Sequence, residues 1–384
     1  MPWNEVSVMD QRREFVRLFE QGGSTHAELC RRFKISRKTG YKWRERAESG
    51  LPGWAGDRSR RPHNSPGQSE AAIEGRVLSV RDAHPAWGAR KIEAWLTRKG
   101  GTPPAPSTIH GILVRHGRIV ELERQTAFKR FEHVAPNLVW QMDFKGRFEL
   151  RDRRWCHALT VVDDHSRYAL CLAACSNEQG DTVRRHLTQV FGQYGLPDAF
   201  LVDNGTPWGN GPERGWTRFG VWLLKLGVEV IYARPYHPQT RGKNERFHRT
   251  LKAEVLALRT FRSLTEVQAA FDHWRELYNH ERPHEALGLA VPASRYRVSP
   301  RPMPRKLLEP EYTSDDIVRR VGTTKSYISF KGRLWAVPQA FLGERVALRP
   351  MDDKGCYGIF FGAREIARLD LEAARRRGAR DVDK

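Results

Sequence analysis

The spacing of apolar positions predicts an all-α helix-turn-helix domain over residues 1–48. Three short amphipathic stretches follow one another there, separated by glycine and polar residues. Ser24 is expected to cap the second helix and Ser36 the third, because a serine side chain accepts a hydrogen bond from the first turn. Tyr41 and Trp43 are the expected apolar anchors of the third helix.

A second helical region follows a segment that does not have the composition of a packed core. Residues 49–68 are rich in Pro, Gly and Ser and are expected to form a basic linker. Residues 69–117 again alternate helices with short turns, with Ser69 as the expected first cap and Pro106 opening the last helix. They predict a second helix-turn-helix-like domain, followed by a polar connector over 118–137.

The pattern changes to strands in the middle of the chain. Residues 138–150, 155–165 and 167–174 are rich in β-favouring residues and predict a three-stranded antiparallel meander. Helices then alternate with strands, which indicates a mixed α/β sheet flanked by helices over 138–298. The later elements are expected at Thr182–Tyr194, Ala199–Val202, Trp216–Leu226, Val228–Tyr232, Thr240–Leu258 and Leu264–Tyr278.

The last part of the chain is strand-like once more. Prolines mark a linker over 299–314, and residues 315–371 contain five short strand-like segments with Lys331-Gly332 as a tight turn. A small β-barrel is expected there, followed by a basic tail over 372–384. The predicted fold is therefore multidomain, with α-helical modules, an α/β core and a C-terminal β-barrel.

The composition limits the class of protein. The mean hydropathy of -0.64 and the absence of a long apolar run predict a cytoplasmic protein with no membrane partner. The 5 cysteines lack zinc-site or disulfide-framework spacing and are expected to be reduced thiols. The formal net charge of +21 favours a nucleic-acid partner, and the central region is the least basic per residue.

Basic side chains gather where DNA contacts are expected. The third N-terminal helix carries the polar set that a major-groove recognition helix needs, although a solvated helix face would look similar. Basic residues of the first linker resemble an arm that enters a minor groove, with a charged tether as the alternative. The expected contacts are Arg37, Lys38, Thr39 and Lys42 on the helix, and Arg58, Arg60 and Arg61 in the linker.

Three acids stand among residues that would otherwise belong to the core. Asp143 lies within a strand, Asp203 follows a short strand, and Glu245 lies on the predicted long helix. Buried carboxylates are costly unless a cation holds them, and oxygen ligands suit Mg²⁺ or Mn²⁺. Two such ions can clamp the attacking and leaving oxygens of a phosphodiester. Asp163 and Asp164 are rival carboxylates, with a role in shaping a turn as the preferred interpretation.

Three sequence blocks resemble those of DDE transposases and retroviral-type integrases, most closely the bacterial insertion-sequence members. They are Trp-Gln-Met-Asp-Phe at 140–144, Leu-Val-Asp-Asn-Gly-Thr-Pro-Trp at 201–208, and His-Pro-Gln-Thr-Arg-Gly-Lys-Asn-Glu-Arg-Phe-His-Arg-Thr-Leu-Lys at 237–252. The resemblance implies an RNase H-like core with two Mg²⁺ or Mn²⁺ ions on Asp143, Asp203 and Glu245. The viral His-His-Cys-Cys zinc module has no counterpart here. The spacing between the second and third acids is wider than usual, and a loop over 209–215 can absorb the excess.

The third block also supplies expected DNA contacts. On an α-helix, Glu245 and Lys252 would lie about 20° apart around the axis, and Arg249 shares that face. The acid could then hold metal while the cations grip phosphates, with surface salt bridges as the alternative. Gln239, Arg241 and Lys243 complete the expected contacts in this block, and His237 is expected to contact DNA rather than metal.

The resemblance implies cleavage at transposon ends and transfer of the 3′-hydroxyl into target DNA. The implied partners are double-stranded DNA at the transposon ends and at the target, and further copies of the chain assembled on that DNA. No small-molecule substrate is expected. An inactive, integrase-like DNA-binding regulator is the main alternative, and a simple metal-dependent nuclease is a third.

Overall fold

The structure is a computed structural model that describes residues 7–58, 68–119, 132–209, 215–232, 242–307 and 309–373. Contacts within the chain divide it into two compact units, residues 1–69 and residues 70–384. The finer domain boundaries given above stay predictions.

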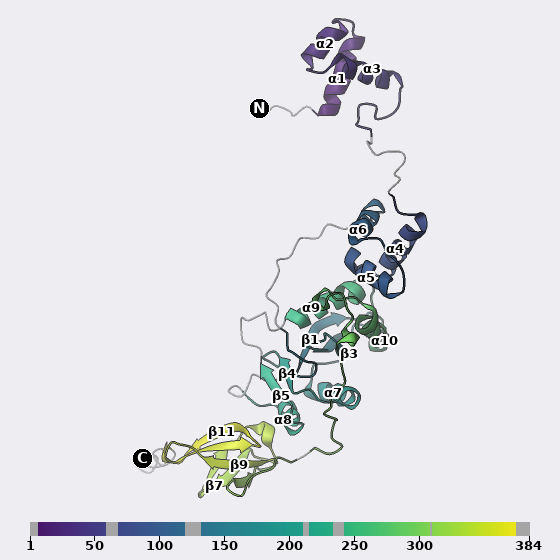
Figure 1. The fold of residues 1–384 in the computed structure, drawn as a ribbon. Helices are drawn as coiled ribbons and strands as arrows, with labels where there is room; N and C mark the ends of the chain where they lie inside the picture. The colour runs from purple at the N-terminus through teal and green to yellow at the C-terminus, as the bar shows by residue number, and fades with distance from the viewer. Residues whose placement is uncertain are drawn as a thin grey trace, which may run out of the picture. The chain divides into compact units, whose positions relative to one another are not determined.

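The first unit contains the three helices expected from the sequence. They are α1 (Val8–Glu20), α2 (His26–Arg32) and α3 (Arg37–Glu48), drawn in purple in Figure 1. Phe15, Leu29 and Trp43 are buried in their small core. Apolar side chains at helical spacing thus meet where the three helices cross.

Two details of this unit differ from the sequence prediction. Thr25, and not Ser24, caps α2, because Thr25 and Glu28 form a reciprocal capping box that Ser24 cannot make from one position earlier. Tyr41 is 56% exposed and stacks on His26, so it is no core anchor. The predicted cap at Ser36 is confirmed by its hydrogen bond from the Thr39 amide at 3.1 Å.

The second unit begins with another three-helix bundle. Its helices are α4 (Ala71–Ala83), α5 (Ala89–Arg98) and α6 (Pro106–Arg115), packed around the fully buried Trp87. Pro106 opens α6 as predicted. The predicted cap at Ser69 is wrong, since Glu70 occupies the cap position of α4 and no side chain caps the helix.

Helix α5 packs on the central region of the chain. The Arg98 guanidinium donates to the carbonyl oxygens of Glu281 at 2.9 Å and of Leu289 at 3.0 Å. The Trp95 indole donates to the Glu281 carboxylate at 3.4 Å, and Lys99 forms an ion pair with the same group at 3.5 Å. The basic end of this helix is therefore occupied by contacts within the protein.

The central region contains a five-stranded sheet with the order β3-β2-β1-β4-β5. The meander β1–β2–β3 is antiparallel as predicted, whereas β1 pairs with β4, and β4 with β5, in parallel. The strands are β1 (Val139–Glu149), β2 (Trp155–Asp163), β3 (Ala169–Cys175), β4 (Ala199–Val202) and β5 (Glu229–Tyr232).

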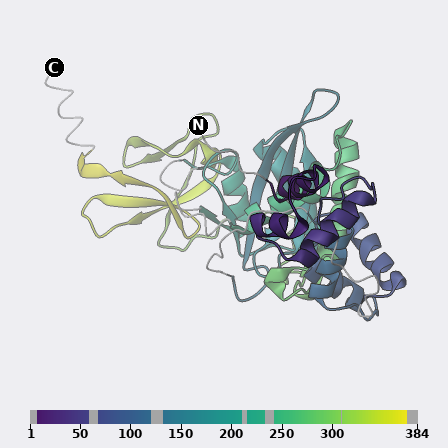
Figure 2. The same cartoon turned by 90° about the horizontal axis from the view of Figure 1, so that it is seen from above.

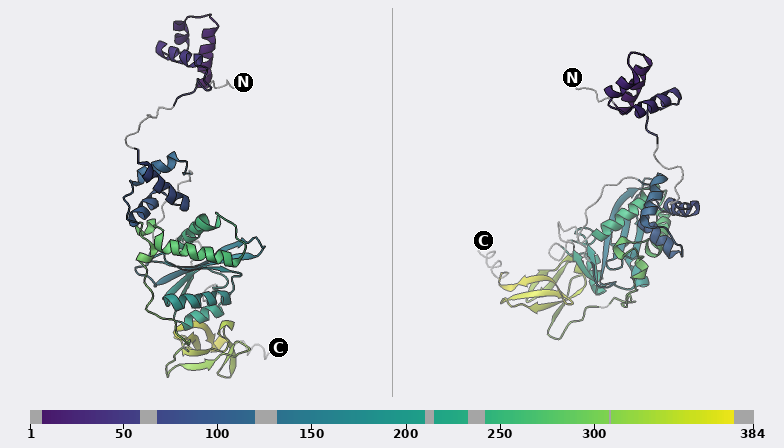
Figure 3. Two further views of the ribbon diagram at one scale, coloured as in Figure 1. Left: turned by 90° about the vertical axis from the view of Figure 1, so that its right-hand side faces the viewer. Right: turned by 45° about the horizontal axis from the view of Figure 1, so that its top comes forward.

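Helices cover both faces of this sheet (Figure 3, left). Helices α7 (Gly180–Tyr194) and α8 (Arg218–Lys225) pack on the face that buries Trp140 and Phe200. Helices α9 (Gly242–Leu251) and α10 (Leu264–Glu276) pack on the opposite face. Alternate residues of each strand point to opposite faces, so the sheet has two separate apolar cores.

The predicted long helix over 240–258 is shorter and ends differently. The α-helix α9 stops at Leu251, and Lys252–Leu256 forms a π-helical turn. Helix α10 likewise continues into a π-helical turn, Leu277–Glu281. π-Turns inside helices shift the faces of the residues that follow them. Lys252 is the first residue of its turn and directly follows α9, so the angle expected between Glu245 and Lys252 stays a prediction.

The C-terminal region is a β domain, but the predicted closed barrel is not confirmed. Among the described residues, one sheet has the order β11-β10-β9-β6 and a separate hairpin pairs β7 with β8 (yellow-green and yellow in Figure 2). The sequence predicts five strands here, and the strand that it misses is the first along the chain, Ile317–Arg320. The strands are β6 (Ile317–Arg320), β7 (Tyr327–Phe330), β8 (Arg333–Ala336), β9 (Arg345–Pro350), β10 (Cys356–Phe361) and β11 (Arg364–Asp370).

Gly195 ends α7 in a place that no other residue fits. Its φ is +73°, and a Cβ there would lie 2.7 Å from the Arg301 carbonyl oxygen and 2.8 Å from that of Ser299. Gly192, three residues earlier on the exposed side of the same helix, has no neighbour within 4 Å of an added Cβ.

We therefore expect Gly195→Ala to lower the free energy of unfolding by about 2 kcal/mol or more, from left-handed backbone strain and the backbone clash together. Gly192→Ala should be neutral or stabilising by up to about 1 kcal/mol, because alanine favours a helix. Urea unfolding of both variants measures the difference. Equal effects of the two substitutions would contradict this account of Gly195.

Candidate functional site

Asp143 lies in β1, and Asp203 lies one residue beyond the end of the neighbouring parallel strand β4. Gln141 of β1 pairs with Leu201 of β4, and each aspartate is two residues further along its chain. Residues two apart on a strand point to the same face. Trp140 and Met142 belong to the α7 core, so Asp143 shares the α9 face with Gln141, whereas β4 ends at Val202, one residue before Asp203. Two of the three predicted acids thus follow paired positions of neighbouring strands, and their meeting at one site stays a prediction.

The loop after Asp203 is fixed beside the strand that carries Asp143. Gly205 and Gly209 exchange backbone hydrogen bonds of 3.0 and 2.8 Å and so close a tight loop. Trp208 within it is buried, and its ring stacks on Phe144 with 5.9 Å between the ring centroids. Phe144 directly follows Asp143, and Trp208 belongs to the loop after Asp203. Their contact therefore holds this loop beside β1.

Helix α9 is attached to β1 and β2 by two polar contacts. The backbone amide of Asn244 donates to the side-chain oxygen of Gln141 at 3.3 Å. Thr160 of β2 donates its hydroxyl to the Asp143 carbonyl oxygen at 2.9 Å and contacts His248 Nε2 at 2.8 Å. A hydroxyl has one proton, so His248 must donate in the second bond and carries its proton on Nε2.

Glu245, the third predicted acid, lies on the exposed side of α9, one residue after Asn244. Its helix is thus held on the strand that carries Asp143, while its side chain faces solvent. No group of three or more His, Cys, Asp or Glu side chains in the described part of the chain is close enough to hold a metal ion. Asp143 and Asp203 carry hard oxygen donors, which is the ligand chemistry that Mg²⁺ and Mn²⁺ require.

The rival carboxylates shape the turn between β2 and β3. Asp163 is fully buried. Its carboxylate accepts hydrogen bonds from the backbone amides of Asn137 at 2.8 Å and of Ser166 at 2.7 Å. Burial raises the pKa of Asp163, against the effect of these hydrogen bonds. This arrangement is that of a structural turn residue.

Asp164 is also buried, but it is paired with a cation. Its carboxylate contacts Lys243 and accepts hydrogen bonds from His133 Nδ1 at 2.9 Å and from the Gln141 amide nitrogen at 2.7 Å. Burial by itself would raise the pKa of Asp164, and the hydrogen bonds from Lys243 and His133 outweigh it, so the pKa lies below its ordinary value. Burial also lowers the pKa of Lys243, and the Asp164 carboxylate opposes that effect.

The predicted DNA contacts of the third block differ in their exposure to solvent. Arg249 and Lys252 are exposed on the same helical segment as Glu245, in its α and π parts respectively. The Lys243 side chain is only 13% exposed and contacts Asp164, so its charge is engaged inside the protein. His237, Gln239 and Arg241 lie outside the described residues.

The recognition residues predicted on α3 lie largely in solvent. Arg37, Lys38 and Lys42 are exposed, and the Lys42 amine also lies 4.9 Å from the centroid of the Trp43 ring. Thr39 is half-buried and its hydroxyl contacts the capping hydroxyl of Ser36 at 2.9 Å. In the first linker Arg58 is exposed, and Arg60 and Arg61 lie outside the described residues.

Sequence reasoning missed the polar residues that support the site. Gln141, Thr160 and His248 are buried, and each makes a hydrogen bond between the sheet and α9 or next to Asp143. Gln141 had a detectable signal, because it is a polar residue two positions before Asp143 in an apolar strand. His248 had none beyond its place on the buried side of the helix.

Family models match most parts of the chain. Two models described as Integrase core domain match residues 133–238 and 226–292. The model for the IS481 family transposase C-terminal domain matches residues 316–377. Two models described as Homeodomain-like domain match residues 7–55 and 39–113.

Similar proteins come from bacterial insertion elements. The chain is 29% identical over 239 residues to the insertion element IS476 uncharacterized 39.2 kDa protein of Xanthomonas euvesicatoria, which is 59% of this chain and 65% of that protein. It is 26% identical over 234 residues to the insertion element IS407 uncharacterized 31.7 kDa protein of Burkholderia multivorans, covering 59% of this chain and 82% of the relative. The match thus spans less than two thirds of the first relative's length.

Among solved structures, the chain resembles one from the simian T-cell lymphotropic virus intasome in complex with PP2A regulatory subunit B56 gamma. That match has 16% identity and a TM-score of 0.37, and covers 76% of this chain and 99% of the other.

In the described part of the present structure, no helix combines the length and apolar character needed to cross a membrane.

Proposed function

Because the chain belongs to the integrase-core superfamily, on the branch of the bacterial insertion-sequence transposases, we propose that it is a metal-dependent transposase that cuts at the ends of its element and joins the 3′-hydroxyl to target DNA. Membership of this family supports a role in DNA recombination of the transposition kind. The cutting and joining steps, the ions and the assembled partners are the finer parts of the proposal.

The observation that carries the proposal is that Asp143 and Asp203 each lie two residues after a paired position of the parallel strands β1 and β4. Two carboxylates held close together repel each other, and a divalent cation between them relieves that repulsion. Strands β1 and β4 are paired at three consecutive positions that end at Gln141 and Leu201, which fixes the segments leading to the two aspartates relative to each other. A pair of ordinary turn residues would not require that alignment.

Asp143, Asp203 and Glu245 would hold the ions. When bound, Mg²⁺ or Mn²⁺ ions lower the pKa of a bound water or hydroxyl and neutralise charge that develops on the phosphodiester. The protein supplies position: β1 and β4 fix two carboxylates, and α9 is held on β1 by Asn244. The chemistry is an in-line displacement at phosphorus, in which the attacking oxygen forms its bond as the leaving 3′-oxygen departs.

Arg249 and Lys252 follow Glu245 on an exposed helical segment and are suited to contact phosphates next to the scissile bond. The exposed face of α3 lies in a separate compact unit and is suited to read the element's end. Joining two ends requires more than one copy of the site, so we propose that the active form is a homo-oligomer on double-stranded DNA.

The first expectation concerns the acids. Asp143→Asn, Asp203→Asn or Glu245→Gln should lower Mg²⁺-dependent cleavage and joining by more than about 100-fold, since each removes a ligand charge. Binding to end DNA should persist. Glu149→Gln, an exposed acid on the same strand as Asp143, is the matched control and should keep full activity. A fully active variant at any of the three positions would remove that residue from the site. Wild-type protein that binds end DNA without cutting or joining would favour the inactive regulator.

The second expectation concerns Lys252. Lys252→Ala should lower joining of a pre-cut end by about tenfold, with the melting temperature nearly unchanged, because an exposed cation contributes little to folding. Lys252→Arg should retain part of the activity, since the charge stays but the head group changes. Lys354→Ala removes an exposed lysine of the C-terminal domain and serves as the control. Unchanged joining in Lys252→Ala would place this lysine on the solvated surface.

The third expectation concerns α3. Lys38→Ala and Lys42→Ala should each weaken binding to end DNA, and each lost phosphate contact should reduce the slope of log affinity against log salt by about 1. Glu45→Gln, an exposed acid on the same helix, should not weaken binding. Fluorescence anisotropy of labelled end DNA over a salt series measures both quantities. Equal affinity for end DNA and random duplex in the wild type would refute sequence reading by this helix.

A further inference from the structure

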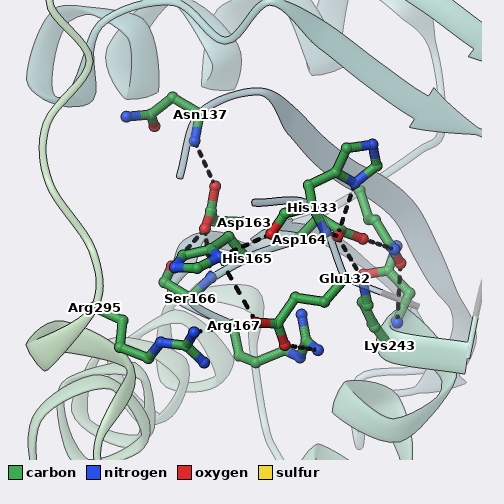
Figure 4. A network of polar contacts seen from close by, with 12 residues as sticks. Glu132, His133, Asn137, Asp163, Asp164, His165, Ser166, Arg167, Lys243 and Arg295 are labelled. Carbon is green, nitrogen blue, oxygen red and sulfur yellow. Dashed lines mark hydrogen bonds and ion pairs between the residues drawn. The ribbon is translucent and has the colours of Figure 1, made fainter. Parts of the chain in front are cut away.

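A buried carboxylate lies between the sheet and the start of α9 (Figure 4). Asp164 is 2% exposed, and both of its oxygens are occupied. Gln141 donates to Oδ1 at 2.7 Å, while His133 donates to Oδ2 from its backbone amide at 3.0 Å and from its ring at 2.9 Å. Lys243 contacts the same oxygen from α9. With these partners the carboxylate is not available as a metal ligand.

Lys243 and Gln141 connect Asp164 to the first turn of α9, immediately before Glu245. Lys243 reaches Asp164 directly. Gln141 reaches the same carboxylate with its nitrogen and accepts the Asn244 amide with its oxygen, so it bridges Asp164 to the helix backbone. Residues 243 and 244 are thus both fixed from one point. A carboxylate beside the first turn of a helix also interacts favourably with the helix dipole.

The turn that carries Asp164 is itself rigidly held. Asp163 accepts the Ser166 hydroxyl at 2.5 Å and the Asn137 amide at 2.8 Å. Arg167 donates to Glu132 at 2.9 Å, and Arg295 pairs with the same carboxylate at 3.1 Å. In Figure 4 these side chains surround the turn from the segment before β1, from β2–β3 and from the segment after α10. The position of Asp164 is therefore set independently of α9.

We propose that the ion pair of Asp164 and Lys243, with Gln141, positions the first turn of α9, and with it the exposed Glu245, relative to Asp143 on β1 and Asp203 after β4. This inference rests on the proposed function for the role of Glu245 itself. Asp164, Gln141 and Lys243 are then positioning residues, and Lys243 acts inside the protein instead of contacting a phosphate as its sequence block suggested. Breaking one side of the pair leaves a buried charge without its partner, which is more disruptive than removing both charges.

The test uses the full-length chain with Asp164→Asn, Lys243→Gln and the two substitutions combined. Each single variant should raise, by about tenfold, both the Mg²⁺ concentration for half-maximal joining and the hydrogen-exchange rate of peptides covering residues 242–251 without metal. The combined variant replaces the ion pair by two amides that can hydrogen-bond, and should return to within about threefold of wild type. Affinity for end DNA should stay unchanged in all three.

Glu254→Gln is the matched control. Glu254 forms a buried ion pair with Arg282 at 2.9 Å in the π-turn that follows α9, with 8% of each side chain exposed. Glu254→Gln also leaves a buried charge without its partner, so it should lower the melting temperature, but it should not change the Mg²⁺ requirement. If the control raises the Mg²⁺ requirement as much as Asp164→Asn does, the pair is merely structural and the proposal is wrong.

A different outcome would restore Lys243 to DNA. If Lys243→Gln and the combined variant weaken DNA binding equally while Asp164→Asn joins normally, Lys243 is a phosphate contact and the proposal is overturned. If the wild type neither cuts nor joins, the proposed function fails, and hydrogen exchange alone decides the positioning claim. Faster exchange at 242–251 in the single variants, with recovery in the combined one, then supports it, and unchanged exchange refutes it.

Discussion

The parallel pairing of β1 with β4 is the constraint on which the rest of the site depends. It sets Gln141 opposite Leu201, and Asp143 and Asp203 each follow two residues later along the chain. A shift of the register by one residue would turn one carboxylate to the other face, where Trp140 and Phe200 are buried. That alternative would bury an uncompensated charge in the apolar core. The apolar packing on the α7 face therefore favours the observed pairing of β1 with β4 over a shifted one.

The same strand organises the helix that supplies the third acid. Gln141 and Asp143 point to the α9 face because they alternate with Trp140 and Met142, which fill the α7 core. Gln141 therefore meets the Asn244 amide, and the backbone of Asp143 meets Thr160, which in turn contacts His248. The alternation of a single strand thus determines which residues form the core, which support the helix and which are left for chemistry.

Much of this arrangement could be predicted from the sequence, and the exceptions have physical reasons. The strand Ala199–Val202 was predicted at its observed bounds, because a short apolar run ends sharply at Asp203. The π-turn at Lys252 could not be predicted, since helix propensity does not distinguish an inserted residue from a regular turn. The pairing of Lys243 with Asp164 joins residues 79 positions apart, and no local pattern reports such a contact. Thr25 replaced Ser24 as a cap because the choice depends on which of two adjacent hydroxyls reaches Glu28.

The distribution of contacts also changes what the net charge of +21 means. A count of basic residues treats every cation as available to a phosphate, yet many in the second unit are engaged inside the protein. Arg98 donates to two backbone carbonyls, and Arg282 and Lys243 belong to buried ion pairs. On α3, by contrast, Arg37, Lys38 and Lys42 are exposed. Binding to DNA depends on cations that can replace its counterions, so the exposed cations of α3 are available for it in a way that Arg98, Arg282 and Lys243 are not. Arg98 and Lys243 instead hold α5 and α9 on the core, which is the rigidity that a site built from two strands and a helix requires.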